Sequence, residues 1–372
     1  MDPGYRGTIH FISSDPQAVL PADYKFTGGD NGVHVFSGGL TLKSAGNRSV
    51  TTTDTASPAI AGFQTVTVTS GPARTLTVVG ASPSAAGAAH TVTVTAKDAF
   101  GNTVTGYLGS IHLTSSDPAA VLPADYTFIP SDKGAHGPIV TFKTAGSRSV
   151  TATDKTTATI SGSQTVKVTP GAAKSLTVVT ATSFVAGGPH TVTITAKDAY
   201  GNTATGYLGR IHFTSTDTKA VLPADYTFLS GDKGVHAFSS GLTFKTAGSR
   251  SVTATDKTTA SVKGSQTGIV VSPGAAKTFK VSTANPYVHG VTHSVTITVL
   301  DACDNVVTGY TGTIHFTSSD SAAGLPADYT FVAGDSGARA MTLTLRTVGT
   351  QTVTVTDKNR ASVTGSQTVS VD

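Results

Sequence analysis

One sequence unit recurs about every hundred residues along this 372-residue chain. The segment Gly-Tyr-x-Gly-x-Ile-His occurs four times, with its tyrosine at Tyr5, Tyr107, Tyr207 and Tyr310. A period of this length exceeds the roughly 20 to 45 residues of a solenoid repeat and matches a small β-sandwich domain. The periodicity therefore predicts a series of separately folded domains in tandem.

The hydrophobic pattern inside one unit predicts β-strands. Residues 190–197 of the third unit read His-Thr-Val-Thr-Ile-Thr-Ala-Lys, which places Val192, Ile194 and Ala196 on one face. A period of two is typical of a half-buried strand. Glycine, aspartate, asparagine and proline separate this segment from six further predicted strands, at 174–180, 210–215, 226–229, 235–245, 249–255 and 265–271. Seven strands match the count of a small two-sheet β-sandwich.

The acidic residues support an all-β chain, because all 22 of them are aspartate. Glutamate is a strong helix former, whereas aspartate prefers caps and turns. The absence of glutamate also excludes the zinc-protease HExxH motif and the closing ligand of an EF-hand.

Charge and hydropathy exclude two classes of partner. The net charge of +4 is spread along the chain without a basic cluster, so we expect no nucleic-acid binding. No apolar run approaches the roughly 20 residues of a membrane-spanning helix, so we expect no membrane insertion. Residues 1–4 lack the features of a signal peptide, and any export signal is expected outside this sequence. The single cysteine, Cys303, cannot form an internal disulfide.

Proline–glycine pairs mark the predicted boundaries between units. Pro170-Gly171 and Pro273-Gly274, with Ser70-Gly71 as a degenerate copy, follow the last predicted strand of each unit. They divide the chain into four repeats, numbered here from the N-terminus: 1–70, 71–170, 171–273 and 274–372. The first repeat lacks the first two strands of the pattern. It is expected to be either part of a longer array or an open unit that accepts strands from another molecule, which would allow self-association into a filament.

Several longer motifs resemble bacterial immunoglobulin-like repeats of invasin-type and adhesin-type surface proteins. They are Lys-Asp-Ala-Phe/Tyr-Gly-Asn-Thr at 97–103 and 197–203, Ala-Gly-Ser-Arg-Ser-Val-Thr-Ala-Thr-Asp at 145–154 and 247–256, and Pro-Gly-Ala-Ala-Lys at 170–174 and 273–277. The resemblance implies tandem Greek-key sandwiches arranged as an elongated rod. It also implies an extracellular or cell-surface location, and it supplies no catalytic residues.

We therefore expect a structural stalk whose partners are neighbouring domains of the same chain, and not an enzyme. Two alternatives stay open. One is the filament subunit described above. The other is an adhesive module that binds a glycan or a host surface protein through its repeated Asp-Pro and Leu-Pro-Ala-Asp-Tyr loops, because exposed loops are where such modules meet their ligands. These loops are interpreted as structural, with the tyrosine packed and its hydroxyl toward solvent.

A histidine in one strand of every repeat raises the question of a Ser-His-Asp catalytic site. These residues are His10, His112, His212 and His315. Alternation places His112 in phase with Thr114, on the face opposite Ile111 and Leu113. An enzyme also needs one pocket assembled from convergent, differing groups, whereas this position repeats in four units. The pattern indicates exposed strand histidines without a catalytic role.

Calcium is the one cofactor that the sequence offers a reason to consider, because aspartate and asparagine oxygens are its preferred ligands. The candidates lie after the second strand (Asp98, Asn102, Asp198, Asn202) and at the end of a later strand (Asp154, Asp256). Each loop provides only one or two carboxylates, and Asp-x-x-Gly-Asn is common turn chemistry. We therefore expect no bound metal and no other cofactor.

Two differences between repeats complete the predictions. The first and third repeats carry two extra residues near 37–39 and 239–241, which predicts a bulge or a longer hairpin. The fourth repeat has Arg339 where the others have His34, His136 and His236, which indicates either a changed contact or drift between copies.

Overall fold

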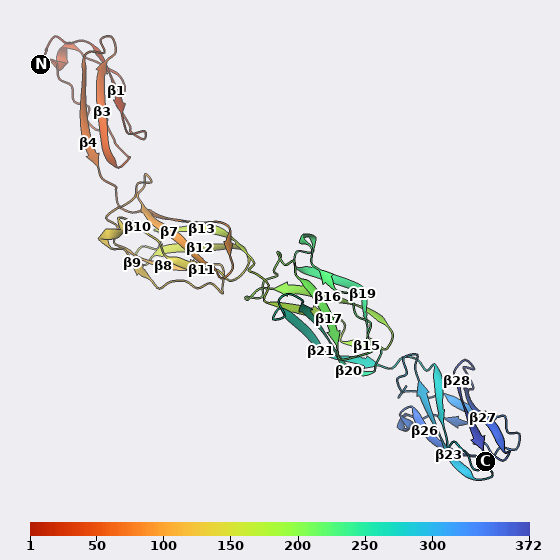
Figure 1. Cartoon of the computed structure of the whole chain (residues 1–372). Coiled ribbons are helices and arrows are strands. Elements are labelled where there is room, and N and C mark those ends of the chain that lie inside the picture. Colours follow the sequence, from red (N-terminus) through yellow and green to blue (C-terminus); the bar gives the residue numbers. More distant parts are fainter. The chain divides into compact units, whose positions relative to one another are not determined.

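A computed structural model describes all 372 residues, which form two compact units, Met1–Gly171 and Ala172–Asp372. Each unit contains two of the sequence repeats, and Figure 1 shows their strands in chain order. The chain contains strands and four 3-10 turns, η1 (Gly28–Asp30), η2 (Pro130–Asp132), η3 (Ser230–Asp232) and η4 (Ala333–Asp335). None of its helical segments is long and apolar enough to cross a membrane. The all-β prediction is confirmed.

The third repeat shows the sandwich most clearly. One sheet has the strand order β14-β16-β19, and the other has the order β15-β21-β20-β17-β18. Their bounds are β14 (Ser175–Val179), β15 (Ser183–Val185), β16 (Pro189–Lys197), β17 (Arg210–Ser215), β18 (Tyr226–Thr227), β19 (Val235–Thr243), β20 (Gly248–Asp256) and β21 (Lys263–Ser272). Alternate residues of both sheets, among them Leu176, Val192 and Val252, meet in one core.

The second and fourth repeats have the same architecture. The second contains β5 (Thr75–Gly80), β6 (Ser84–Ala85), β7 (Ala89–Lys97), β8 (Ser110–Ser115), β9 (Tyr126–Thr127), β10 (Ala135–His136), β11 (Ile139–Thr141), β12 (Gly146–Asp154) and β13 (Ser161–Thr169). The fourth contains β22 (Thr278–Ser282), β23 (Thr292–Leu300), β24 (Thr313–Ser318), β25 (Tyr329–Thr330), β26 (Ala338–Thr344), β27 (Gly349–Asp357) and β28 (Thr364–Val371). There a bridge between Thr278 and Thr364 joins both layers into one sheet.

The seven strands predicted for the third repeat are all present, although their ends differ by a few residues. The structure adds an eighth, β15, which pairs in parallel with β21 after the chain has crossed from one sheet to the other. Strand β6 pairs with β13 in the same way in the second repeat. These strands are not predicted from the sequence, because two or three residues are too few to show a period.

The predicted bulge is confirmed in the third repeat. The pairing of β16 with β19 shifts register between His190 and Val192, and Ser240 on the bulged strand has φ +52°. In the first repeat the extra residues instead form a turn, in which the Gly39 N–H donates to the Phe36 carbonyl over 3.2 Å. The reason is that the strand which would pair with this segment is missing from residues 1–70.

The first repeat forms a single sheet with the order β2-β1-β3-β4. Its strands are β1 (Thr8–Ser13), β2 (Tyr24–Lys25), β3 (Gly46–Asp54) and β4 (Ala61–Val68). Residues 1–70 contain no strand equivalent to β5, β7 or β11 of the second repeat. One layer of the sandwich is therefore open.

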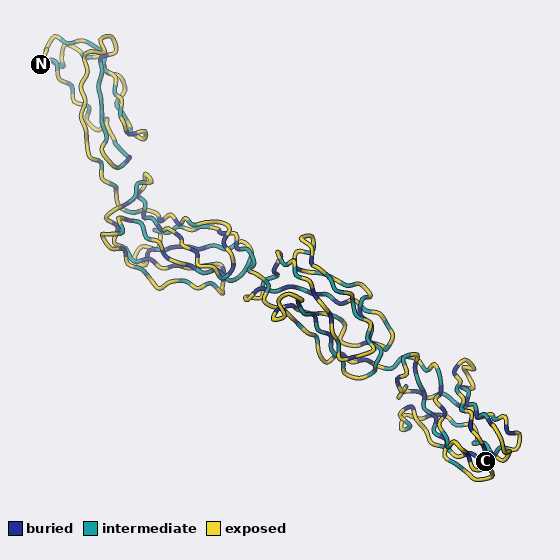
Figure 2. Tube along the Cα trace, viewed as in Figure 1, coloured by how far each residue is buried: buried dark blue, intermediate teal, exposed yellow.

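Burial also distinguishes the open first repeat from the three closed repeats, as Figure 2 shows along the trace. Three hydrophobic cores are present, and each draws its buried residues from one repeat: the second, the third or the fourth. No apolar side chain of residues 1–70 is fully buried. Because burial of apolar area is the main stabilising contribution in folding, the three closed repeats hold themselves together. The exact four-domain division stays a prediction, since the compact units number two.

Candidate functional site: aspartate clusters and the joints between repeats

The loop after the second strand of the second repeat is organised by one buried carboxylate, Asp98. Its oxygens accept hydrogen bonds from the backbone N–H groups of Gly71, Phe100 and Asn102, over 2.9 to 3.0 Å. They also accept one from the Asn102 side-chain amide over 2.8 Å. Burial alone would raise the pKa of Asp98, but these hydrogen bonds lower it to about 2. The ionised carboxylate thus fixes the orientation of Asn102.

Asn102 uses its remaining hydrogen-bonding capacity on the preceding repeat. Its amide nitrogen donates to the Lys43 carbonyl over 2.7 Å, and its side-chain oxygen accepts from the Ala45 N–H over 2.8 Å. One side chain therefore satisfies a donor and an acceptor of the loop between β2 and β3. We call this arrangement an asparagine clamp.

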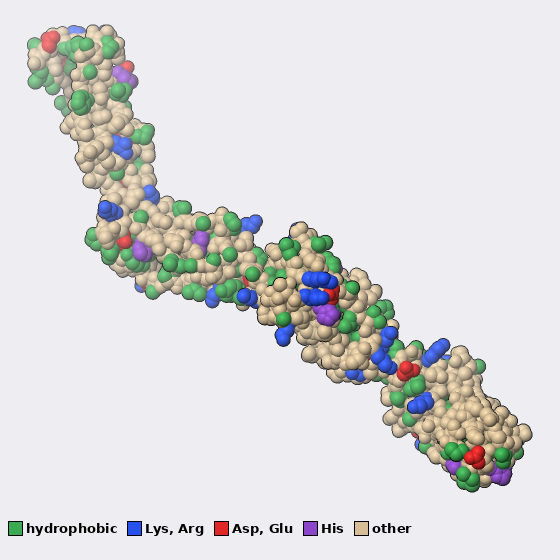
Figure 3. All heavy atoms as spheres, viewed as in Figure 1, with side chains coloured by type: hydrophobic (Ala, Val, Ile, Leu, Met, Phe, Trp, Pro, Cys, Tyr) green, Lys and Arg blue, Asp and Glu red, His purple; other side chains and the backbone are tan.

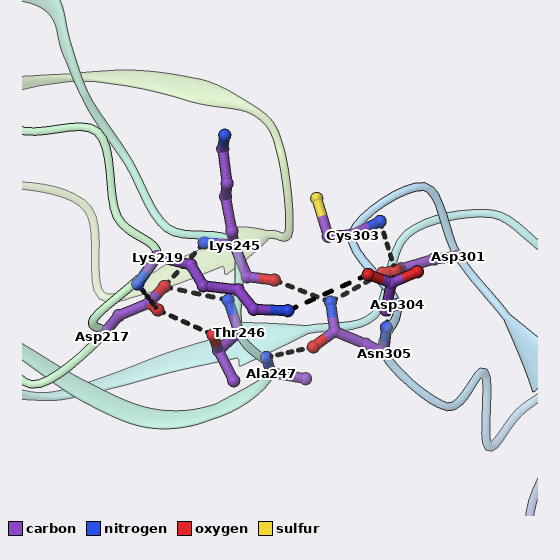
Figure 4. Close-up of polar contacts among 9 residues, drawn as sticks. All are labelled: Asp217, Lys219, Lys245, Thr246, Ala247, Asp301, Cys303, Asp304 and Asn305. Carbon is purple, nitrogen blue, oxygen red and sulfur yellow. Dashed lines mark hydrogen bonds and ion pairs between the residues drawn. The ribbon is translucent and has the colours of Figure 1, made fainter.

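The second unit contains the same clamp between the third and fourth repeats (Figure 4). The Asn305 amide donates to the Lys245 carbonyl over 2.8 Å, and its oxygen accepts from the Ala247 N–H over 2.8 Å. Asp301 holds Asn305 through the backbone N–H and the side-chain amide, over 2.8 and 2.9 Å. The clamp therefore persists although the fourth repeat departs from the Asp-Ala-Tyr-Gly-Asn sequence.

Each clamped loop is also anchored from inside its own repeat. Asp217 follows β17, and its carboxylate accepts from the backbone N–H groups of Lys245 and Thr246, over 2.7 and 2.9 Å, and from the Thr246 hydroxyl over 2.7 Å. In the first unit Asp15 binds Lys43 and Ser44 similarly. Asp217 and Asn305 therefore hold the same three-residue backbone stretch, Lys245 to Ala247, from its two sides (Figure 4). The aspartate thus has this structural role both in Asp15-Pro16 and in Asp217-Thr218, where no proline follows it.

The calcium candidates fall into two kinds of hydrogen-bond cluster. Asp198 accepts from the backbone N–H of Tyr200 and from both the backbone and the side-chain nitrogen of Asn202, over 2.8 to 2.9 Å, as Asp98 does with Asn102. Asp154 and Asp256 belong to the other kind, which is built around a tyrosine.

In this second kind, the carboxylate joins a strand end to a buried phenol. Asp256 accepts from the Tyr207 hydroxyl over 2.5 Å and from the N–H groups of Thr258 and Thr259 over 2.8 and 2.7 Å. Asp154 accepts from the Tyr107 hydroxyl in the same way. Burial and the hydrogen bond to the carboxylate raise the pKa of Tyr207. No three or more histidine, cysteine or aspartate side chains of the chain are grouped so as to hold a metal ion.

The strand histidines lie on the exposed face, as alternation predicts. His112 is 57% exposed and its Nδ1 lies 2.6 Å from Asp125, the aspartate of Leu-Pro-Ala-Asp-Tyr, which also accepts from Lys155. The corresponding pairs in the other repeats are His10–Asp23, His212–Asp225 and His315–Asp328. This pairing is not among the predictions from the sequence, although histidine and aspartate are 13 residues apart in every repeat. The pairs lie on open strand surfaces, and the four hollows of about 320 to 440 Å³ described on the chain have none of these residues in their walls.

The tyrosine of the same segment corrects one expectation. The Tyr226 hydroxyl does not point free into solvent but donates to Asp232 over 3.0 Å, and His236 stacks on the ring with centroids 3.9 Å apart. In the fourth repeat Arg339 lies 4.9 Å above the Tyr329 ring and pairs with Asp335 over 3.2 Å. Arginine thus makes the same two contacts as histidine, so the substitution does not alter the cluster.

No protein-family model matches the sequence, and no curated protein matches it. Experimentally determined structures do match. FdeC, an Escherichia coli adhesin, is 22% identical over 82% of this chain and 100% of its own, with a TM-score of 0.41. Invasin, a bacterial integrin-binding protein, is 17% identical over 98% of this chain and 72% of its own, with a TM-score of 0.32. InvD of Yersinia pseudotuberculosis is 16% identical over 80% of this chain and 96% of its own, with a TM-score of 0.32. The chain is therefore similar to adhesins of bacteria, the class that its sequence motifs resemble.

Proposed function

We propose that the chain is a structural spacer of an extracellular or cell-surface bacterial protein of the adhesin type. The asparagine clamp carries this proposal. It occurs between the repeats of both units, and it connects the backbone of one repeat to a side chain fixed by a buried aspartate in the next. Such a contact limits bending at a joint without creating a ligand site.

The surface supports a spacing role over a catalytic one. Only 13% of the residues are charged, and Figure 3 shows charged groups scattered among uncharged polar side chains and backbone on the face in view. The aspartates with the strongest interactions, such as Asp217 and Asp301, are buried and already accept several hydrogen bonds. A reactive site needs groups that are poised toward a substrate, whereas these groups are occupied by the fold.

Small-angle scattering of the whole chain tests the proposal. Three sandwiches and the open first repeat in series, with strands of about eight residues rising ~3.3 Å per residue, would extend on the order of 120 to 160 Å. A rod of that length has a radius of gyration of about 40 Å, against about 21 Å for a compact globule of this size. We expect the larger value, unchanged by a calcium chelator. The smaller value would contradict a spacer.

Binding arrays address the adhesive alternative directly. The whole chain would be applied to glycan and host-protein arrays beside a variant in which the Asp-Pro loops carry Pro16→Ala and Pro118→Ala. We expect no saturable binding by either protein. Binding by the natural chain that the variant loses would assign the loops a recognition role instead.

A further inference from the structure

We propose that the open face of the first repeat binds a two-stranded polypeptide segment with the sequence pattern of residues 171–197. This face lies over β1, β3 and β4, the strands whose equivalents in the other repeats support a second sheet. Two hollows of about 440 and 340 Å³ lie on it. Both have Thr52 and Gly62 in their walls, so they adjoin along β4. The closed repeats show what such a face receives.

A glycine in the last strand is the first sign that the face is shaped for a strand. In the second repeat a Cβ on Gly162 would lie 1.8 Å from the Leu76 carbonyl oxygen, so only glycine allows the first strand to approach so closely. A Cβ on Gly264 would likewise lie 1.8 Å from the Leu176 carbonyl oxygen, and a Cβ on Gly365 would lie 1.8 Å from the Phe279 carbonyl oxygen. Gly62 is the matching residue of the first repeat. A Cβ there would meet only the Thr52 hydroxyl, at 3.8 Å.

A glutamine two residues later is the second sign. In the third repeat the Gln266 side chain accepts from the Thr180 N–H over 2.6 Å and donates to the Thr180 carbonyl over 3.1 Å. Gln367 makes the same pair of bonds with Thr283, and Gln164 donates to the Gly80 carbonyl over 2.7 Å. These bonds hold the backbone at the end of the first strand. Gln64 occupies this position in the first repeat, on the wall of the open hollow.

The apolar side chains of the face are the third sign. Val66 is 37% exposed, whereas its equivalent Val166 is fully buried beneath the first two strands of the second repeat. Phe11 and Val50 line the same hollow. Thr52 replaces Ala152 of the second repeat, but its hydroxyl donates to the Gly62 carbonyl over 3.4 Å, so it adds no unpaired polar group. Covering these side chains would remove apolar area from water, which favours binding.

The nature of the occupant is inferred from the segment that covers the equivalent face in the third repeat. Strands β14 and β16 pair antiparallel and direct Leu176, Val178 and Ile194 into the core, with threonines alternating on the outer face. A second copy of the chain has no such segment to give, because all three of its copies are buried in their own repeats. The proposed occupant is therefore a separate two-stranded segment of this pattern, and not one of the three that the closed repeats already hold.

A labelled synthetic peptide of residues 171–198, added to the whole chain, tests the proposal by fluorescence anisotropy. We expect saturable 1:1 binding and none by a scrambled peptide. Gly62→Val places a branched side chain where the strand carbonyl must lie, and Gln64→Ala removes the backbone hydrogen bonds, so each should weaken binding at least about ten-fold. Thr65→Val, on the opposite face of β4, should bind like the natural chain.

Folding of the variants is checked separately. A Cβ at Gly62 has room in the unbound chain, so Gly62→Val should keep the unfolding midpoint of the natural chain in the absence of peptide. Absence of peptide binding, or equal binding by Gly62→Val and the natural chain, would overturn the proposal. So would self-association of the chain alone that Gly62→Val abolishes, because a second copy would then be the occupant.

Discussion

Removing one clamp should loosen the loop that it holds without unfolding either repeat. The substitution is Asn305→Ala, which deletes the two hydrogen bonds to the loop, to the Lys245 carbonyl and from the Ala247 N–H. It also deletes the side-chain bond to Asp301 within the fourth repeat, but it keeps the backbone N–H that Asp301 binds. The reporter is the amide of Thr246. It lies between the two lost contacts, and its own acceptor, Asp217, is unchanged.

The magnitude follows from the number of bonds lost. A typical hydrogen bond contributes about 0.5 to 1.5 kcal/mol net, so two bonds contribute about 1 to 3 kcal/mol to the closed loop. At 1.4 kcal/mol for each factor of ten, the Thr246 amide should exchange with deuterium about 5 to 150 times faster. Mass spectrometry of a peptide covering residues 243–248 measures this rate in the whole chain.

A matched control lies at the same joint. Lys219 and Asp304 approach to 3.9 Å, but their side chains are 59% and 76% exposed (Figure 4). Exposed ion pairs contribute little, so Lys219→Ala should change the exchange rate less than about two-fold. If Asn305→Ala leaves Thr246 exchange unchanged, or if Lys219→Ala accelerates it equally, the clamp does not hold the loop.

Three further predictions concern the closed repeats. Gly264→Val should destabilise the third repeat by more than about 3 kcal/mol in urea unfolding, because its Cβ would meet the Leu176 carbonyl; a smaller loss would show that the strands can move apart. Burial alone would raise the pKa of Asp117, but its hydrogen bonds lower it to about 2, below its unfolded value near 3.9. Its stabilisation should therefore be complete above about pH 4 and disappear between pH 4 and 2, and Asp117→Asn should flatten this part of the acid-unfolding curve; an unchanged curve refutes the assignment. Arg339→His should cost less than about 1 kcal/mol in thermal unfolding, because histidine makes the same contacts in the other repeats; a larger loss would show that the two residues are not equivalent.

Much of the fold could be predicted because the information is local. The alternation at 190–197 specifies a strand with one buried face, and Val192, Ile194 and Ala196 are buried as expected. The fourfold recurrence of Gly-Tyr-x-Gly-x-Ile-His gave the repeat without any structural knowledge. The three-residue strand β15 could not be found this way, because its position depends on parallel pairing with β21, more than 80 residues later.

The joints could be anticipated only in part. The sequence singled out Asp98 and Asn102 as a loop pair, and turn chemistry explains their mutual bonds. Nothing local shows that the Asn102 amide faces Lys43, 59 residues earlier, since this contact depends on how two folded repeats meet. Likewise, spacing alone could not show that Arg339 stacks on Tyr329, because that geometry belongs to the finished sandwich.

Single-molecule stretching of the whole chain tests the central claim most directly, namely that three repeats each fold around a core of their own. Each closed repeat holds roughly 100 residues, and an extended residue spans ~3.3 to 3.6 Å. The account predicts three separate unfolding events that each lengthen the chain by about 300 Å, and no fourth event of that size from residues 1–70. One cooperative event, or two larger events corresponding to Met1–Gly171 and Ala172–Asp372, would contradict it.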